Sequence, residues 1–224
     1  AVVTGGPFTG AAFAALPFDH LLFTGATEVA PHILRAAADN LTPVTLELGG
    51  KCPVIVGRSN TVRDVAAKVM NGRLLNGGQV CFIPDYVLVP REGLEVFVAE
   101  AAAAVSAMYP ALGDNGDFTA IISDRHYRRL LAYLEEAKAR GCRIVELNAG
   151  AEAPPDAGRR KIAPTLVVDP PQDMALTREE VFGPILAVHP YDRIEEAIDF
   201  VNARPRPLAL YYFGRDREET RQVL

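Results

Sequence analysis

The heptapeptide Asn76-Gly77-Gly78-Gln79-Val80-Cys81-Phe82 places a single cysteine shortly after a pair of glycines. Upstream lies Leu46-Glu47-Leu48-Gly49-Gly50-Lys51, in which the carboxylate of Glu47 precedes Cys81 by 34 residues (81 − 47). A thiolate can attack a carbonyl carbon, and a carboxylate can then activate the water that releases the acyl group. The glycines allow a close approach of backbone and ligand because they carry no Cβ. The alternative is that Cys81 is a small buried side chain, as free cysteines usually are.

Two further motifs stand in order along the chain. They are Phe23-Thr24-Gly25-Ala26-Thr27-Glu28-Val29 and Glu179-Glu180-Val181-Phe182-Gly183-Pro184. Together with the first two motifs and their spacing, they resemble the aldehyde dehydrogenase superfamily, and the resemblance runs along essentially all 224 residues. This resemblance favours a catalytic thiol over a buried one.

Three shorter stretches resemble the class 3 branch of that family, and within it the bacterial coniferyl aldehyde dehydrogenases. They are Cys81-x-x-Pro84-Asp85-Tyr86, Asp117-Phe118-Thr119 with His126-Tyr127, and Arg206-Pro207-Leu208-Ala209-Leu210-Tyr211. The resemblance implies an aromatic aldehyde, such as coniferyl aldehyde, as the substrate. Because these stretches are framework residues and not pocket residues, they do not identify the side chains that would select the substrate.

The resemblance implies a role for each candidate residue. Cys81 would attack the aldehyde carbon, and Glu47 would activate water to hydrolyse the thioester. Glu180 would hold a ribose of the cofactor, and Phe182 would border its nicotinamide. The expected cofactor is NAD, with NADP not excluded. The remaining expected cofactor contacts are Gly25, Ala26, Val29, Leu48 and Gly49.

One departure from the family pattern concerns the cofactor loop, because family members often carry Gly where this chain has Ala30. The resemblance also implies a homodimer. Two alternatives stay open. One is acyl transfer to coenzyme A, although that branch of the family usually lacks the base at Glu47. The other is a non-catalytic unit that serves only folding or assembly.

Apolar periodicity and turn residues predict an α/β fold in which strands and helices alternate. We expect strands at 20–24, 44–48, 86–89, 143–147, 165–168 and 208–213, with a strand end at 2–4. We expect helices at 10–16, 28–39, 61–75, 94–105 and 123–140, one after a capping box of Asp192 and Glu195, and one from Asp216. In the helix that Ser123 caps, Tyr127, Leu130, Leu131 and Leu134 are expected to face inward. Polar loops are expected at 114–117 and 150–160.

A domain boundary is expected near Gly49-Gly50, where a second strand–helix–strand series begins. The resemblance implies that residues 1–49 are the end of a Rossmann-type cofactor domain and that 50–224 are an α/β catalytic domain. We expect both ends to lie inside a longer protein, because the chain begins in a predicted strand and stops in a helical pattern.

The composition limits the class of protein. The chain is 49% hydrophobic and 23% charged, as is ordinary for a globular protein with a sizeable core. A formal net charge of −5 argues against a general nucleic-acid binder. No window approaches the roughly 18 apolar residues of a membrane span, and no leader pattern suggests secretion. We expect a small-molecule aldehyde as the substrate, and neither nucleic acid nor membrane as a partner.

The cysteines and histidines indicate no metal site. Cys52, Cys81 and Cys142 stand at scattered spacing, which suits neither a disulfide framework nor a zinc motif. This usage favours a reducing compartment, and we expect the cytoplasm. The four histidines lie far apart, without ligand spacing.

Overall fold

The computed structural model describes residues 1–113, 115–148 and 158–224. The chain forms two compact units, Ala1–Gly49 and Gly50–Leu224. Residue 114 and most of the expected loop at 150–160 lie outside the described residues.

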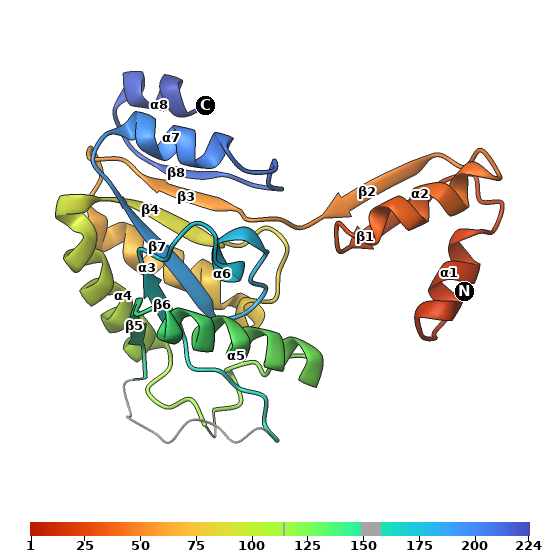
Figure 1. Cartoon of the computed structure of the whole chain (residues 1–224), viewed down its shortest axis with the longest axis horizontal. Helices are drawn as coiled ribbons and strands as arrows, with labels where there is room; N and C mark the ends of the chain where they lie inside the picture. The colour runs from red at the N-terminus through yellow and green to blue at the C-terminus, as the bar shows by residue number, and fades with distance from the viewer. Residues whose placement is uncertain (114, 149–157) are drawn as a thin grey trace. The chain divides into compact units, whose positions relative to one another are not determined.

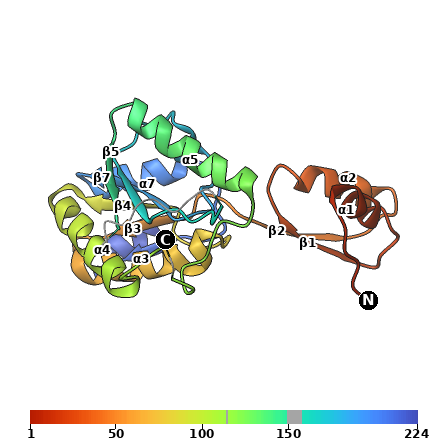
Figure 2. The same cartoon turned by 90° about the horizontal axis from the view of Figure 1, so that it is seen from below.

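The first unit is a small α/β element (Figures 1 and 2). Two parallel strands pair from Leu21↔Val44 to Gly25↔Leu48, and α2 packs on both of them and on α1. The small core contains buried Ala14, Leu21 and Ala37. The elements are α1 (Pro7–Ala14), β1 (Leu21–Gly25), α2 (Ala30–Ala38) and β2 (Val44–Leu48).

Three predictions for this unit were wrong in detail. Helix α1 begins at Pro7, three residues before the predicted start, because proline suits the first turn of a helix. Residues 2–4 form no strand, since no strand of the described residues pairs with them. Helix α2 begins at Ala30, two residues later than expected, with Pro31 in its first turn.

The second unit is built on a six-stranded sheet of order β5-β6-β7-β4-β3-β8. Strands β6, β7, β4, β3 and β8 are parallel to one another, and β5 is antiparallel to β6. The strands are β3 (Pro53–Val56), β4 (Tyr86–Pro90), β5 (Arg143–Glu146), β6 (Thr165–Val168), β7 (Ile185–Tyr191) and β8 (Tyr211–Phe213). The α-helices are α3 (Val62–Leu74), α4 (Leu94–Met108), α5 (Asp124–Ala139), α6 (Ala175–Arg178), α7 (Ile194–Asn202) and α8 (Arg217–Val223). Two 3₁₀ turns are η1 (Leu75–Gly78) and η2 (Arg91–Gly93).

Helices cover both faces of this sheet. Val87 and Val89 of β4 join one core cluster with α3 and α4, whereas Tyr86 and Leu88 join another with α7. Helix α5 packs over β6 and β7 through a third cluster that includes Leu130. Because side chains alternate between the faces of a strand, each strand feeds both layers. Figure 1 shows α3 and α4 on the face opposite α7.

Strands β3 and β7 were missed by the sequence analysis. All four residues of β3 are buried, and six of the seven residues of β7 are buried. A strand covered on both faces reads as a continuous apolar run, which periodicity alone does not distinguish from a buried helix segment. The predicted strand at 208–213 is shortened to β8, which begins at Tyr211.

The capping box of α7 is shifted by one residue from the prediction. The carboxylate of Glu196, not Glu195, accepts the N–H groups of Asp192 (2.9 Å) and Arg193 (3.4 Å). The carboxylate of Asp192 is instead bound by the Arg91 guanidinium at 2.8 and 2.9 Å. The Asp192 carboxylate therefore forms an ion pair, and the side chain that accepts N–H groups at the start of α7 is that of Glu196.

The predicted apolar face of α5 is confirmed at Tyr127 and Leu130, which are buried. Leu131 is exposed, and Tyr133 is buried in its place. The start of the helix is as predicted, since the Ser123 hydroxyl accepts the N–H of His126 at 3.3 Å.

Candidate functional site

The candidate residues of the second unit stand shortly before parallel strands. Cys81 comes before β4, and Glu180 and Phe182 come before β7. Because these strands are parallel, their amino ends lie along one edge of the sheet. Ligands of open α/β sheets usually gather at the carboxyl ends. The candidate site of this unit therefore lies at the opposite edge from the usual one.

Helix α3 ends in a left-handed turn that leads to the candidate nucleophile. Gly77 and Gly78 have φ of 63° and 82°. A Cβ at Gly77 would lie 2.7 Å from the carbonyl oxygen of Thr119, and a Cβ at Gly78 would lie 2.2 Å from that of Gly183. Only glycine fits both the backbone angles and the space. The turn thus brings the motif at 76–82 against the motif at 179–184.

Gln79 ties this turn to a neighbouring segment. Its Nε2 donates to the carbonyl oxygens of Asn76 and Ala120, both at 3.0 Å. Its Oε1 accepts the N–H of Ile122 at 2.9 Å. These three bonds use the two kinds of polar atom of a primary amide, which explains why this position of the motif is a glutamine.

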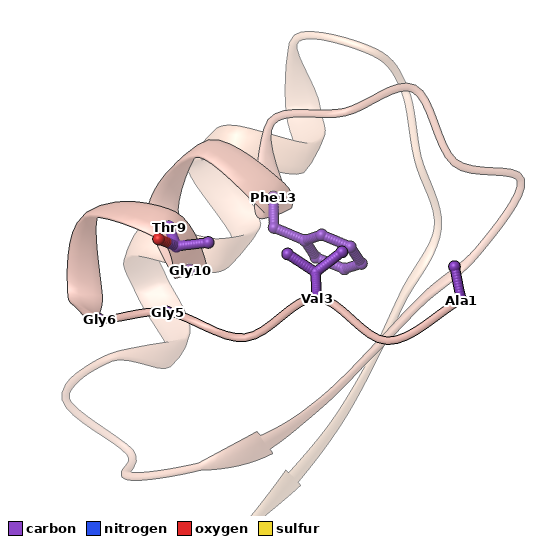
Figure 3. Close-up of a pocket in the computed structure, with 7 residues that line it drawn as sticks. All are labelled: Ala1, Val3, Gly5, Gly6, Thr9, Gly10 and Phe13. Carbon is purple, nitrogen blue, oxygen red and sulfur yellow. The ribbon is translucent and has the colours of Figure 1, made fainter.

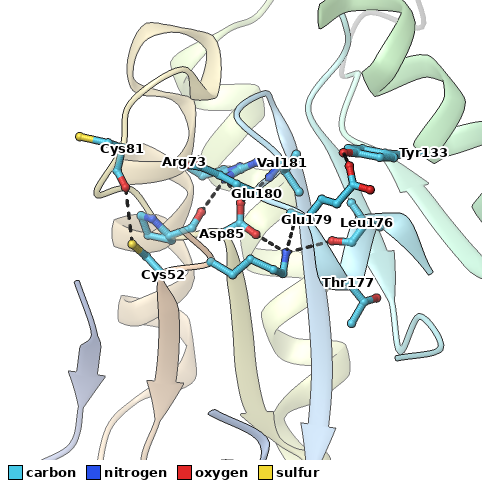
Figure 4. A network of polar contacts seen from close by, with 12 residues as sticks. Cys52, Arg73, Cys81, Asp85, Tyr133, Leu176, Thr177, Glu179, Glu180 and Val181 are labelled. Carbon is cyan, nitrogen blue, oxygen red and sulfur yellow. Dashed lines mark hydrogen bonds and ion pairs between the residues drawn. The ribbon is translucent and has the colours of Figure 1, made fainter. Parts of the chain in front are cut away.

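Cys81 differs from the neighbouring thiol in its surroundings. Cys81 is partly exposed, whereas Cys52 is fully buried and burial raises the pKa of the Cys52 thiol. The Cys52 thiol donates to the carbonyl oxygen of Cys81 at 3.6 Å. The hydroxyl of Tyr211 donates to the next carbonyl, that of Phe82. In Figure 4 the sulfur of Cys81 points away from that of Cys52.

A buried charge network adjoins the loop (Figure 4). Lys51 and Asp85 form an ion pair whose side chains are 9% and 3% exposed. The buried Arg73 lies 3.5 Å from the second oxygen of Asp85 and donates to the carbonyl of Pro84 at 2.8 Å. Burial lowers the pKa of Lys51, and Asp85 opposes that shift. Since an unpaired buried charge costs several kcal/mol, both cations depend on this one carboxylate.

Glu180 and Phe182 lie in the loop before β7. Glu180 is half-buried, its carboxylate accepts the backbone N–H of Gly50, and burial raises its pKa. Phe182 has φ of 48°, which is costly for a residue with a side chain. A carboxylate of this kind has acceptor capacity left for hydroxyl groups. Glu180 therefore stays a candidate for the ribose contact that the family resemblance implies.

The other predicted residues belong to the first unit. The pairing of β1 with β2 sets Gly25 opposite Leu48, and Thr24 opposite Glu47. Glu47 is exposed at the end of β2 and is followed by Gly49.

The predicted cofactor loop follows β1. The carbonyl of Ala26 accepts the N–H of Val29 at 3.0 Å, and Val29 precedes the first residue of α2. Pro31 in that first turn has no N–H, which reduces the number of free donors available to a phosphate.

Two open hollows are present, one in each unit. One in the first unit, of about 240 Å³, is lined by Ala1, Val3, Gly5, Gly6, Thr9, Gly10 and Phe13 (Figure 3). The hydroxyl of Thr9 is its one polar side-chain group. The other, of about 460 Å³, is lined by residues between Val201 and Leu210, including Arg204 and Arg206. Neither lining includes Cys81.

In the described part of the chain, no three His, Cys, Asp or Glu residues group as metal ligands would. Across the same residues, no helix has both the length and the apolar character needed to cross a bilayer.

Comparison with known proteins identifies the family. The model of the "Aldehyde dehydrogenase family" matches residues 1–224. The chain belongs to this family. The resemblance and the expected α/β, aldehyde dehydrogenase-like fold are thereby confirmed.

Several curated members of the family are similar along the whole chain. The chain is 55% identical to the coniferyl aldehyde dehydrogenase of Pseudomonas sp. (strain HR199) over 222 residues, which are 99% of this chain and 46% of that protein. It is 54% identical to a probable coniferyl aldehyde dehydrogenase of Caulobacter vibrioides over 224 residues, 100% of this chain and 46% of that one. The chain thus spans about half the length of the curated relatives it matches.

Solved structures of the family share the fold. A substrate-bound Staphylococcus aureus AldH has a TM-score of 0.89 and 34% identity over 99% of this chain and 47% of its own. An aldehyde dehydrogenase of Mycobacterium tuberculosis, complexed with NAD+, has a TM-score of 0.83 and 31% identity over 98% of this chain and 46% of its own.

The sequence analysis assigned no role to several residues that hold the site. Gln79, Lys51 and Asp85 were quoted only as letters of motifs, and Arg129 was not singled out. A signal for the buried pair was present in the sequence. Lys51 and Asp85 each stand shortly before an apolar strand, and charged side chains are rarely buried there without a partner of opposite charge.

Proposed function

We propose that the protein containing this chain oxidises an aromatic aldehyde, such as coniferyl aldehyde, to its carboxylic acid with NAD or NADP. The observation that carries the proposal is the contact between the Cys81 loop and the Glu180–Phe182 loop. That contact is so close that a Cβ at Gly78 would lie 2.2 Å from the carbonyl oxygen of Gly183. It joins the candidate nucleophile to the candidate cofactor residues. Three relatives that are 50–55% identical and are named as coniferyl or probable coniferyl aldehyde dehydrogenases support the substrate class.

In this proposal, residues 1–49 end the cofactor domain and residues 50–224 form the catalytic domain. Glu180 would bind ribose hydroxyls and Phe182 would border the nicotinamide. Gly25, Ala26, Val29, Leu48 and Gly49 would line the rest of the cofactor path. When bound, the nicotinamide supplies the acceptor for a hydride. NAD-complexed family members support this cofactor class without separating NAD from NADP.

The chemistry follows from the two reactive side chains. The Cys81 thiolate adds to the aldehyde carbon, and the oxygen of the former carbonyl becomes an oxyanion that the Cys81 backbone N–H can stabilise. The oxyanion re-forms the C=O bond as the C–H bond breaks and its electron pair leaves as hydride, which produces a thioester on Cys81. Glu47 removes a proton from water, the water oxygen attacks the thioester, and the C–S bond breaks to release the acid and the thiolate.

The alternative acceptor is coenzyme A. Glu47 favours water, because thioester hydrolysis needs a base and transfer to a thiol does not. The proposal includes a homodimer, which the family resemblance implies. It also includes a cytoplasmic location, which the odd and scattered cysteines support.

The test uses the intact gene product that contains these residues. It is mixed with coniferyl aldehyde and either NAD+ or NADP+, with and without coenzyme A, while absorbance of the reduced cofactor and the acid product are followed. We expect reduction of one cofactor and formation of the free acid without coenzyme A. A requirement for coenzyme A would favour acyl transfer, and no reduction of either cofactor would favour the non-catalytic unit.

A further inference from the structure

We propose that Arg129 is a positioning residue that holds the Glu180–Phe182 segment in the conformation that binds the cofactor, an inference that rests on the proposed function. Arg129 lies on α5, in a part of the chain to which no candidate site residue belongs.

The guanidinium of Arg129 bridges two successive carbonyls. Nη1 donates to the oxygen of Glu180 at 3.0 Å, and Nη2 donates to that of Val181 at 2.8 Å. Nη1 also donates to the hydroxyl of Tyr133 at 2.8 Å, and this hydroxyl donates to the Glu179 carboxylate at 2.7 Å. Helix α5 therefore holds three consecutive residues of the loop through one cation and one phenol.

The opposite side of the same segment is held from the sheet. The N–H of Val181 donates to Asp85 at 2.9 Å, and Lys51 Nζ donates to the carbonyl oxygens of Leu176 (2.9 Å) and Glu179 (3.0 Å). The peptide groups from Glu179 to Val181 are thus bonded from both sides. Figure 4 shows the sheet-side bonds and the bond from Tyr133 to Glu179.

Such support is needed because the next residue is strained. Phe182 has φ of 48°, a conformation that persists in a residue with a side chain only where the surroundings impose it. Arg129 bonds the two carbonyls that lead into this residue. The planar guanidinium of arginine can donate to two carbonyl oxygens in fixed directions. The ammonium of lysine acts as a point charge, so a lysine at this position would orient the two carbonyls less well. Glu180 directs its carboxylate to the N–H of Gly50, so a shift of the segment would move both predicted cofactor contacts.

The experiment compares Arg129→Gln with Arg128→Gln in the intact protein. Arg128 is the neighbouring residue of α5 and is exposed, so this variant matches the change in charge without touching the loop. We expect the dissociation constant of the reduced cofactor, measured by fluorescence titration, to rise about tenfold or more in Arg129→Gln, since small misplacements of binding groups can cost up to about 10²-fold. Arg129→Lys should show an intermediate rise. The rate of Cys81 alkylation without cofactor should stay within about twofold of wild type.

A second measurement is amide exchange at Val181, whose N–H donates to Asp85. This exchange should be slow in the cofactor-free wild-type protein and faster in Arg129→Gln, because Arg129 holds the same segment before the cofactor binds. A folded Arg129→Gln with wild-type cofactor affinity would overturn the inference, and so would a Val181 amide that becomes protected only when cofactor is added. Failure of the proposed function would give a different result from these two outcomes. The wild-type protein would then reduce neither NAD+ nor NADP+ in the presence of an aldehyde.

Discussion

The backbones of Gly78 and Gly183 touch, although 105 residues (183 − 78) separate them in sequence. A Cβ on Gly78 would lie 2.2 Å from the carbonyl oxygen of Gly183, and φ of Gly78 is +82°. This contact is the point at which the loop of the candidate nucleophile meets the loop of the candidate cofactor residues.

The first prediction is that Gly78→Ala distorts both loops. A left-handed alanine costs about 1–2 kcal/mol, and the clash with the Gly183 carbonyl adds to that cost. We expect a lower thermal midpoint and a loss of aldehyde oxidation in the intact protein. Gly116→Ala is the control, because a Cβ at Gly116 meets no atom within 4 Å. Equal thermal midpoints and equal activities for the two variants would show that the close contact between Gly78 and Gly183 is not needed for stability or activity.

The second prediction concerns the thiols. Iodoacetamide should modify Cys81 before the other two cysteines. Peptide mapping of the labelled protein locates the modified residue. Cys52 is fully buried, and burial raises the pKa of both Cys52 and Cys142, so less thiolate is present at those two positions. Faster labelling of Cys52 or Cys142 would remove Cys81 from its proposed role.

The third prediction separates the two halves of the reaction. In Glu47→Gln of the intact protein, hydride transfer should survive while thioester hydrolysis slows, because only the second half needs the carboxylate. Stopped-flow absorbance should show a burst of reduced cofactor followed by a slow steady rate. Loss of the burst would mean that Glu47 also activates Cys81.

The fourth prediction concerns acid stability. His189 is buried beside Tyr86 and Phe200, and burial, helped by Arg204 and Lys51, lowers its pKa to about 3. Its ordinary value is about 6.5. Between these values the unfolded chain binds more protons, so the free energy of unfolding should fall as pH falls from about 6.5 towards 3, by at most about 1.4 kcal/mol per pH unit.

Thermal midpoints between pH 7 and pH 4.5 test this. His189→Leu should flatten the fall, and His32→Leu, which changes an exposed histidine, should leave it as in wild type. The same slope in His189→Leu and wild type would show that another group controls the acid response.

The fifth prediction concerns these 224 residues expressed alone. They should neither bind the nicotinamide cofactor as tightly as the intact protein nor turn over aldehyde. The first unit has only a two-stranded sheet and leaves large apolar side chains such as Phe8 (94%) and Leu41 (89%) exposed. Titration calorimetry measures the binding. A dissociation constant equal to that of the intact protein would place the whole cofactor site within this chain.

Local patterns were enough to predict most elements of the fold. The helices at α3, α4 and α5 follow from apolar side chains at helical spacing, since their inner faces pack on the sheet and their outer faces meet water. Cys81 and Glu47 were predicted because each stands in a short motif whose letters are adjacent in the chain.

The errors have a common physical origin in contacts that the local pattern does not contain. Strands β3 and β7 are apolar runs that periodicity alone does not distinguish from buried helix segments. Glu196 caps α7, while the Asp192 carboxylate is bound by Arg91. Leu131 is exposed where Tyr133 is buried, because the position of α5 on the sheet decides which edge of its apolar stripe is covered.

The sequence by itself predicted the α/β class, the family, and Cys81 and Glu47 as the candidate thiol and base, because each prediction depends on short motifs of adjacent residues. Only the tertiary structure decided which edge of the sheet holds the candidate site, which carboxylate neutralises Lys51, and which side chain holds the loop of Glu180. Asp85 meets Val181, and Arg129 meets Glu180, across 96 and 51 positions. Buried polar groups need hydrogen-bond partners, and the spacing of residues along the chain does not predict which distant residues will supply them.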